Sequence, residues 1–167
     1  VLFQGLPKGD KMEMVIQKNV ELGVHAIVPV SMKRCVVKLD EKKAQAKQKR
    51  WQQISESAAK QAKRGIVPEI LPVMSFAQAL DYAKDFEQKL LPYECAEGIE
   101  GTRRILSGIQ PGQKVAVFIG PEGGFDEKEV EAAKDAGFQV LTLGRRILRT
   151  ETAGMMLLSV LGYLLEE

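Results

Sequence analysis

The sequence has few residues of the kinds that bind metals or form disulfides. Its 167 residues include two cysteines and one histidine. Cys35 and Cys95 lie far apart in the chain, and no cysteine or second histidine stands near His25. No zinc or disulfide framework has such a spacing, so we predict no metal site. We interpret both cysteines as reduced structural thiols of a cytosolic protein.

Long apolar runs and a strong net charge are also absent. No stretch is long and apolar enough to cross a bilayer, and no signal peptide is recognisable. The formal net charge is +2, so any affinity for nucleic acid must come from local basic patches rather than from bulk charge. We therefore expect a cytoplasmic protein with no membrane partner.

The length and composition are those of one globular domain. A hydrophobic fraction of 45% is enough for a proper core, and no second composition regime or internal repeat is present. The first residues, VLFQG, look like the remnant of an engineered protease site. We therefore leave residues 1–5 out of the expected fold and place a single domain at residues 6–167.

Helical and extended patterns alternate along the chain. The periodicity and the capping residues predict helices over Lys11–Leu22, Asp40–Arg64, Ser75–Lys84, Thr102–Ser107, Asp126–Gly137 and Ala153–Leu165. Runs of β-prone residues predict strands over Ala26–Val30, Ile66–Leu71, Gln88–Glu94, Val115–Ile119 and Phe138–Leu143. Residues 35–37 could form a short strand or an extended loop. The alternation predicts an α/β fold with a mainly parallel sheet flanked by helices.

Two loops near the end of the chain carry the strongest functional signal. Gly120–Gly124 follows a buried strand and precedes a helix, and Gly144–Thr152 follows the next strand. In a parallel sheet both loops lie at the carboxyl edge, where ligands of open α/β sheets bind. Glycines there can adopt positive φ and bring bare backbone close to a ligand. The alternative is a pair of ordinary turns with solvated arginines.

Two further segments suggest binding surfaces. The predicted helix Asp40–Arg64 ends in a basic cluster, Lys60, Lys63 and Arg64, which could contact RNA phosphates or could be a solvated face. The last predicted helix is apolar nearly all round, so it lies either in the core or in a subunit interface.

The two loops resemble a known family. GPEGGF at Gly120–Phe125 and LGRRILRTETA at Leu143–Ala153 are similar to the signature loops of the small-subunit ribosomal RNA uridine-N3 methyltransferases, in the SPOUT class. LPKGDKMEMVIQKNVELGV at Leu6–Val24 and ILPVMSFAQAL at Ile70–Leu80 also resemble that family. The resemblance covers essentially the whole chain after the first five residues.

The resemblance implies a fold, a cofactor and partners. Members carry a carboxyl-terminal deep trefoil knot, an exception to the rule that chains do not knot. They bind S-adenosylmethionine, act as homodimers, and methylate uridine N3 in 16S rRNA of the small ribosomal subunit. Whole members have an amino-terminal PUA-like domain, so this chain looks like a catalytic domain alone. The alternative is a SPOUT-fold RNA-binding or ribosome-assembly module without catalysis.

The resemblance assigns the cofactor pocket, and a mechanism is hypothesised beside it. Arg149 would stabilise charge on the uracil, Glu151 is one candidate for the general base, and Arg145 or Arg146 would hold an RNA phosphate. The basic cluster of Lys60, Lys63 and Arg64 is a candidate RNA contact from its charge pattern alone. The expected cofactor pocket consists of Pro92, Tyr93, Gly120, Glu122, Gly123, Gly124, Leu143, Gly144, Ile147, Leu148 and Arg149.

Overall fold

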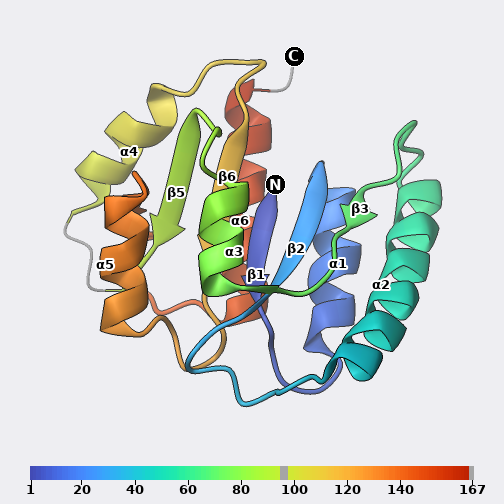
Figure 1. The fold of residues 1–167 in the computed structure, drawn as a ribbon. Coiled ribbons are helices and arrows are strands. Elements are labelled where there is room, and N and C mark those ends of the chain that lie inside the picture. Colours follow the sequence, from blue (N-terminus) through green and yellow to red (C-terminus); the bar gives the residue numbers. More distant parts are fainter. Residues whose placement is uncertain (95–97, 166–167) are drawn as a thin grey trace.

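A parallel β-sheet forms the centre of the computed structural model, which describes residues 1–94 and 98–165 (Figure 1). Its seven strands have the order β3-β2-β1-β6-β5-β7, with β4 also paired to β2. They are β1 (Leu2–Gly5), β2 (Ala26–Ser31), β3 (Glu69–Ile70), β4 (Met74–Ser75), β5 (Gln88–Pro92), β6 (Val115–Ile119) and β7 (Gln139–Leu141). The predicted α/β class with a mainly parallel sheet is confirmed, whereas the knot stays a prediction.

Strand β1 lies in the middle of the sheet, between β2 and β6. Leu2, Phe3 and Gln4 are fully buried, and the Phe3 ring stacks on Phe118 of β6 with centroids 4.5 Å apart. Leaving residues 1–5 out of the fold was therefore wrong. A parallel strand that is buried on both faces needs a near-continuous apolar run. Residues 1–5 contain such a run, and their resemblance to a protease site does not exclude them from the sheet.

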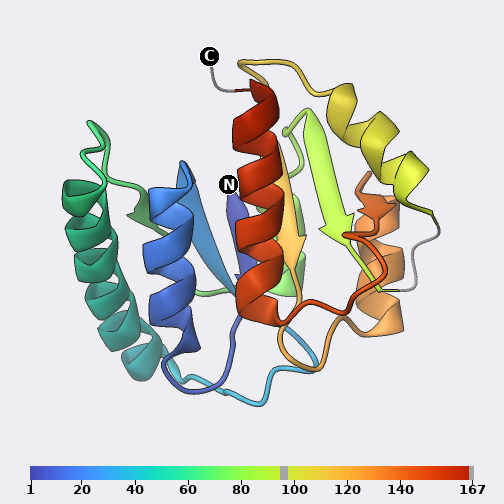
Figure 2. The same ribbon diagram turned by 180° about the vertical axis from the view of Figure 1, so that it is seen from behind.

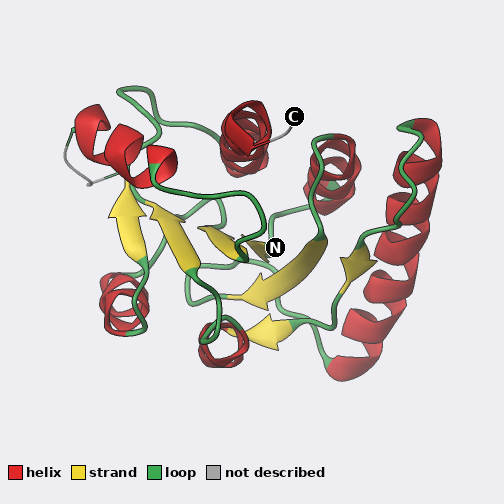
Figure 3. Cartoon of the chain, turned by 90° about the horizontal axis from the view of Figure 1, so that it is seen from above, coloured by secondary structure: helices red, strands yellow, loops and turns green. Residues whose placement is uncertain are grey.

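Helices cover both faces of the sheet (Figures 2 and 3). Helices α1, α4 and α6 lie on one face and α3 and α5 on the other, while α2 packs against α1 and β3. The helices are α1 (Lys11–Glu21), α2 (Glu41–Gln61), α3 (Phe76–Tyr82), α4 (Ile99–Ser107), α5 (Glu127–Asp135) and α6 (Thr150–Leu165). Among these described helices, none is long and apolar enough to span a membrane.

Side chains at the amino ends fix where several helices begin. Asp126 and Glu129 form the capping box that their spacing predicts, and Ser75 begins α3 in the same way. Asp10 occupies the N-cap position of α1, but its side chain makes no capping hydrogen bond. The predicted N-cap position of Asp10 is therefore confirmed, but its side chain does not cap the helix.

Three helices end with the same backbone motif. Gly23 after α1, Lys63 after α2 and Gly137 after α5 have φ values of 87°, 55° and 88°. In each case the next residue donates its N–H to the carbonyl five positions earlier, as Arg64 does to Ala59 at 2.9 Å. This is the Schellman motif. It ends α2 at Gln61 rather than at Arg64, because residue 63 leaves the helical conformation.

The segment before α3 is less regular than predicted. The strand expected over residues 66–71 is reduced to β3, since Ile66 and Val67 are 65% and 47% exposed and Pro68 cannot donate a ladder hydrogen bond. Residues 35–37, for which two conformations were open, form a loop. The free Cys35 thiol is buried there, and burial raises its pKa. Cys95 lies outside the described residues.

The carboxyl-terminal helix α6 is covered on one side. Gly154, Leu157 and Leu161 are buried, and a Cβ atom added to Gly154 would lie 3.4 Å from Asn19 Oδ1 of α1. In contrast, Tyr163 is 89% exposed although its neighbours along the helix are largely apolar. The chain by itself therefore leaves part of the apolar surface of α6 open.

Candidate functional site

A cavity of about 520 Å³ lies at the carboxyl ends of β5, β6 and β7, within the size range of small-molecule sites. The structure brings every residue of the expected cofactor pocket to this cavity, including Pro92 and Tyr93 at the end of β5. Tyr93 N–H donates to Leu141 O of β7 at 2.9 Å, which joins two of the walls. Segments far apart in the sequence meet here because parallel strands end at one edge.

The glycines of the first loop are favoured for two reasons, close neighbours at Gly120 and Gly123 and a positive φ at Gly124. A Cβ atom at Gly120 would lie 3.2 Å from the Gly124 carbonyl carbon, and one at Gly123 would lie 3.1 Å from Arg34 Cβ. Gly124 has open space but a φ of +68°, a conformation that residues with a Cβ rarely adopt. The loop thus presents bare backbone to the cavity.

The second loop supplies an apolar wall of the cavity, next to its arginine side chains. Its turn is set by Gly144, whose φ is 111° and whose N–H donates to Thr142 Oγ1 at 3.2 Å. Leu143 and Leu148 are half-buried, and Ile147 is 83% exposed although it lines the cavity. An exposed isoleucine on a cavity wall offers apolar surface to a planar ligand group.

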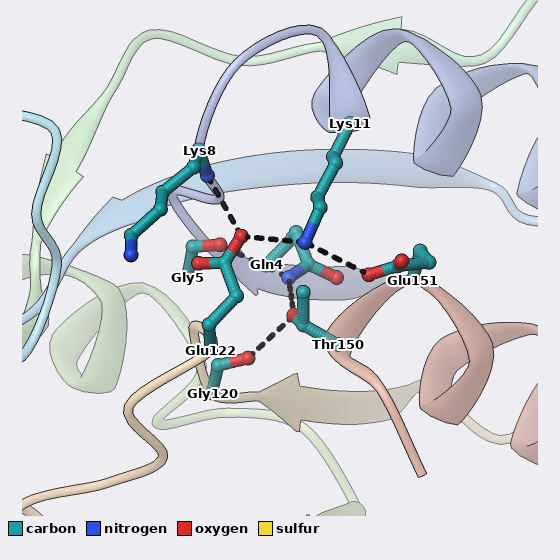
Figure 4. Close-up of polar contacts among 8 residues, drawn as sticks. All are labelled: Gln4, Gly5, Lys8, Lys11, Gly120, Glu122, Thr150 and Glu151. Carbon is teal, nitrogen blue, oxygen red and sulfur yellow. Dashed lines mark hydrogen bonds and ion pairs between the residues drawn. The ribbon is translucent and has the colours of Figure 1, made fainter.

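The two loops are fastened together by the first residue of α6. The Thr150 hydroxyl donates to Gly120 O at 2.6 Å and accepts from Gln4 Nε2 of β1 at 2.8 Å (Figure 4). Gln4 is fully buried, so the hydrogen bonds form away from competing water. The central strand that sequence analysis excluded thus helps to position the cavity.

The carboxylates of the two loops differ in their surroundings. Glu122 accepts hydrogen bonds from Lys8 N–H at 2.9 Å and from Lys11 Nζ at 3.1 Å. Burial raises the pKa of Glu122, but these hydrogen bonds and the Lys11 charge together lower it by more than burial raises it. The net pKa therefore lies below its ordinary value. Glu151, the expected candidate base, does not line the cavity and lies 3.8 Å from Lys11 Nζ.

The basic residues assigned to RNA divide between opposite edges of the sheet. Arg145 and Arg146 are exposed at the cavity. Lys60, in the last turn of α2, and Lys63 and Arg64, which follow it, instead lie at the amino edge, where Arg64 Nη1 donates to Val24 O, just before β2, at 2.7 Å. Its guanidinium also reaches the carbonyls of Val20 and Gly23. The structure therefore gives Arg64 a structural role at the end of α1.

Sequence reasoning gave no role to several residues of the cavity region, among them Gln4, Lys11, Glu94 and Thr150. A polar glutamine inside the apolar run of residues 1–5 was a detectable signal, because buried polar side chains need partners. Thr150 lies within the second motif, yet no role was given to it. No feature of the sequence distinguishes Lys11 from the other lysines as a residue of the cavity. Within residues 1–94 and 98–165, no group of acidic, histidine or cysteine side chains could hold a metal ion.

Comparison with known proteins gives consistent matches. A family model described as an RNA methyltransferase domain matches residues 1–162. Over 97% of its length the chain is 44% identical to ribosomal RNA small subunit methyltransferase E of Bacillus subtilis, of which it spans 64%. It is 40% identical to the protein of the same name from Mesomycoplasma hyopneumoniae, matching 95% of the chain and 67% of that relative.

A solved structure resembles the whole chain. The ribosomal RNA small subunit methyltransferase E of Neisseria gonorrhoeae, bound to S-adenosyl methionine, superposes with a TM-score of 0.86 at 40% identity. The match covers 98% of this chain and 65% of that one. The chain therefore spans about two thirds of the length of such relatives.

Proposed function

Because the chain belongs to the RNA methyltransferase domain family, we propose that it methylates small-subunit ribosomal RNA at uridine N3, with S-adenosylmethionine as the methyl donor. The cavity between the two loops carries this proposal. The names of the relatives support a ribosomal RNA substrate, and the loop motifs, by their resemblance, support the N3 atom.

The residues present fit the cofactor. Leu143, Ile147 and Leu148 would hold the adenine, with hydrogen bonds from backbone groups of the second loop. The glycine loop would accept the rest of the molecule against bare backbone, where added Cβ atoms would meet neighbours at 3.1–3.2 Å. When bound, S-adenosylmethionine supplies an electrophilic methyl group, so the protein's task is chiefly to align donor and acceptor.

Arg149 is proposed to act on the acceptor base. Its side chain comes from the end of the second loop and lines the cavity. Uridine N3 becomes a good nucleophile when its proton leaves and negative charge spreads onto the uracil oxygens. A guanidinium held against one of those oxygens stabilises this charge, as an oxyanion hole does.

Glu94 is better placed than Glu151 to accept the N3 proton. Glu94 lines the cavity at the end of β5 and is exposed, and no ion pair joins it to another described residue. Glu122 lines the cavity too, but its lowered pKa makes it a weak base. We infer that Glu94 is the candidate general base, and that Glu94→Gln will lower turnover by roughly 10²-fold or more while leaving cofactor affinity unchanged.

A second copy of the chain is proposed to cover α6. Tyr163 and Leu164 are 89% and 46% exposed, and residues such as Met156 and Val160 beside them are half-buried. Homodimerisation through this helix would remove that apolar surface from water. Sedimentation analysis of the chain and of Leu164→Asp tests this: dimers for the first and monomers for the second are expected.

Calorimetric titration with S-adenosylmethionine, with ATP as the control ligand, is the first test of the function. Saturable binding of S-adenosylmethionine alone is expected. Purified small ribosomal subunits that lack the modification should then gain a methyl group, which nucleoside mass spectrometry would locate at uridine N3. No binding by a folded protein would contradict the enzyme and favour an RNA-binding or assembly module without catalysis.

A further inference from the structure

We propose that Lys11, at the start of α1, is a positioning residue that holds the two cofactor loops in their binding-competent arrangement. The inference rests on the proposed function for the identity of the ligand. It concerns a residue outside both loop motifs, and it follows from the contacts that the Lys11 ammonium makes.

The Lys11 side chain connects the two loops through their carboxylates (Figure 4). Its Nζ atom lies 3.1 Å from Glu122 Oε1 of the first loop and 3.8 Å from Oε2 of Glu151, where the second loop runs into the first turn of α6. Glu122 also accepts the Lys8 backbone N–H at 2.9 Å. One ammonium therefore links the loop after β6 and the loop after β7 to the start of α1.

The surroundings of Glu151 favour a cation at this position. Its Oε2 atom is buried and has no hydrogen-bond partner among the described residues, and the same holds for Gln4 Oε1. Figure 4 shows the Gln4 side-chain oxygen turned to the side of the Glu151 carboxylate. Without Lys11, the Glu122 and Glu151 carboxylates would lose the cation that lies near both of them, and the link between the two loops would loosen.

The remaining link between the loops is short and uncharged. Thr150 Oγ1 donates to Gly120 O at 2.6 Å, close to the strand ends, whereas Glu122 lies two residues further along its loop. Loss of the Lys11 contacts would therefore release the outer part of the first loop while its base stays attached. The side chains of Lys11, Glu122 and Glu151 are 34%, 24% and 15% exposed, so solvent screens the contacts only in part.

Lys11→Met tests the proposal, because methionine keeps an unbranched side chain without the charge. If loss of the charge leaves about one molecule in ten with competent loops, the dissociation constant for S-adenosylmethionine rises about tenfold. Lys11→Arg should restore affinity to within about twofold, since a guanidinium can also bridge two carboxylates. Lys18→Met is the matched control, because Lys18 lies on the same helix and pairs with Glu21 at 3.0 Å. We expect it to bind as the parent does.

The double variant Lys11→Met with Glu122→Gln separates positioning from general destabilisation. If Lys11 acts through Glu122, the second substitution costs little more than the first, and the two effects on affinity are not additive. Equal affinity of Lys11→Met and the parent would overturn the proposal, as would full additivity in the double variant.

Hydrogen exchange without ligand keeps this inference distinct from the proposed function. In Lys11→Met the amide of Gly124, which donates to Pro121 O at 2.9 Å, should exchange faster, and in Lys18→Met it should not. If the parent protein does not bind S-adenosylmethionine but the Gly124 amide still exchanges faster in Lys11→Met, the proposed cofactor is wrong and the positioning role of Lys11 is supported. Unchanged exchange would contradict the positioning role even if the cofactor binds.

Discussion

The two edges of the sheet use similar residues for different purposes. At the amino edge, Gly23, Lys63 and Gly137 have positive φ values because each ends a helix in a Schellman motif. At the carboxyl edge, glycine is favoured at positions 120 and 123 because backbone and side-chain atoms lie 3.1–3.3 Å from where a Cβ would be. A lysine can replace glycine in the first situation, as Lys63 shows, whereas in the second a Cβ atom would require its neighbours to move by a few tenths of an ångström.

The arginines divide in the same way. At the amino edge, Arg64 is turned onto the last carbonyls of α1 and the residues after it. At the carboxyl edge, Arg145, Arg146 and Arg149 are exposed beside the cavity. The comparison teaches that a basic cluster near a helix end can serve the backbone, whereas exposed arginines on a cavity loop are available to a ligand.

The largest effect is expected at the carboxyl edge from Arg149→Ala. Loss of one charge-stabilising donor typically costs about 10²–10³-fold in turnover, and we expect that loss here at saturating cofactor on small ribosomal subunits. Arg64→Ala at the amino edge should lower the melting temperature but keep turnover per folded molecule. Near-normal turnover by Arg149→Ala would remove the proposed role of Arg149.

Gly5→Ala should disturb the carboxyl edge through packing. Its new Cβ would lie 2.7 Å from the Pro121 backbone nitrogen, and relieving such a clash typically costs about 1–3 kcal/mol of unfolding free energy. Because Pro121 belongs to the glycine loop, affinity for S-adenosylmethionine should fall as well.

Gly112→Ala, in the turn before β6, is the matched control for Gly5→Ala. Gly112 has open space but a φ of +88°, so alanine costs roughly 1–2 kcal/mol in backbone strain alone. Urea unfolding and calorimetry should show both variants destabilised, with affinity lowered in Gly5→Ala only. Unchanged affinity of Gly5→Ala for S-adenosylmethionine would show that packing at Gly5 does not affect the cavity any more than strain at Gly112 does.

RNA affinity should depend on the arginines of one edge. Replacing both Arg145 and Arg146 by glutamine should weaken binding to small ribosomal subunits and reduce the salt slope by about 0.7–0.9 per lost phosphate contact. Replacing Lys60 and Lys63 by glutamine should leave the slope unchanged. Binding measured over a series of salt concentrations compares the pairs, and an equal reduction of the slope in both double variants would support the Lys60 cluster as an RNA contact.

Stability at low pH provides a subtler comparison of the edges. The pKa of Glu87 is lowered by backbone hydrogen bonds, including that from Lys114 N–H before β6, and the pKa of Glu122 is lowered as described above. A carboxylate with a lowered pKa stabilises the fold above its unfolded pKa, and that contribution is lost as pH falls through the folded value. Glu87→Gln and Glu122→Gln should each flatten the loss of stability below pH 4.5.

The ligand separates these two glutamate variants. At neutral pH, only Glu122→Gln should also weaken S-adenosylmethionine binding, because only Glu122 contacts Lys11. Urea unfolding over a pH series and calorimetry at neutral pH provide the two measurements. A steep acid loss in both variants would show that other groups dominate the pH dependence.

The smallest effect is expected from Lys63→Gly. Glycine removes the steric cost of the positive φ, and its greater freedom in the unfolded chain offsets part of that gain. We expect about 0.5 kcal/mol of added stability and no change in cofactor affinity, measured by urea unfolding and calorimetry. A clear loss of stability would mean that the Lys63 side chain makes a contribution of its own.

Local patterns predicted much of the site because its motifs are continuous in sequence. The capping box of Asp126 and Glu129 and the glycine loop need few distant partners to be recognised. Strand Leu2–Gly5 was not predicted, because the sequence VLFQG suggested the remnant of an engineered protease site. The role of Arg64 was missed because its acceptors, the carbonyls near Gly23, lie about forty residues away.

The sequence by itself determined the alternation of helices and strands, the two loops that line the cavity, and the family. These depend on periodicity, turn residues and motifs within short windows. Only the tertiary structure decided that Gln4, Lys11 and Thr150 meet the glycine loop, and that the Lys60 cluster lies at the other edge. The reason is topological: strand order and direction decide which loops meet, and neither is written in any one segment of the chain.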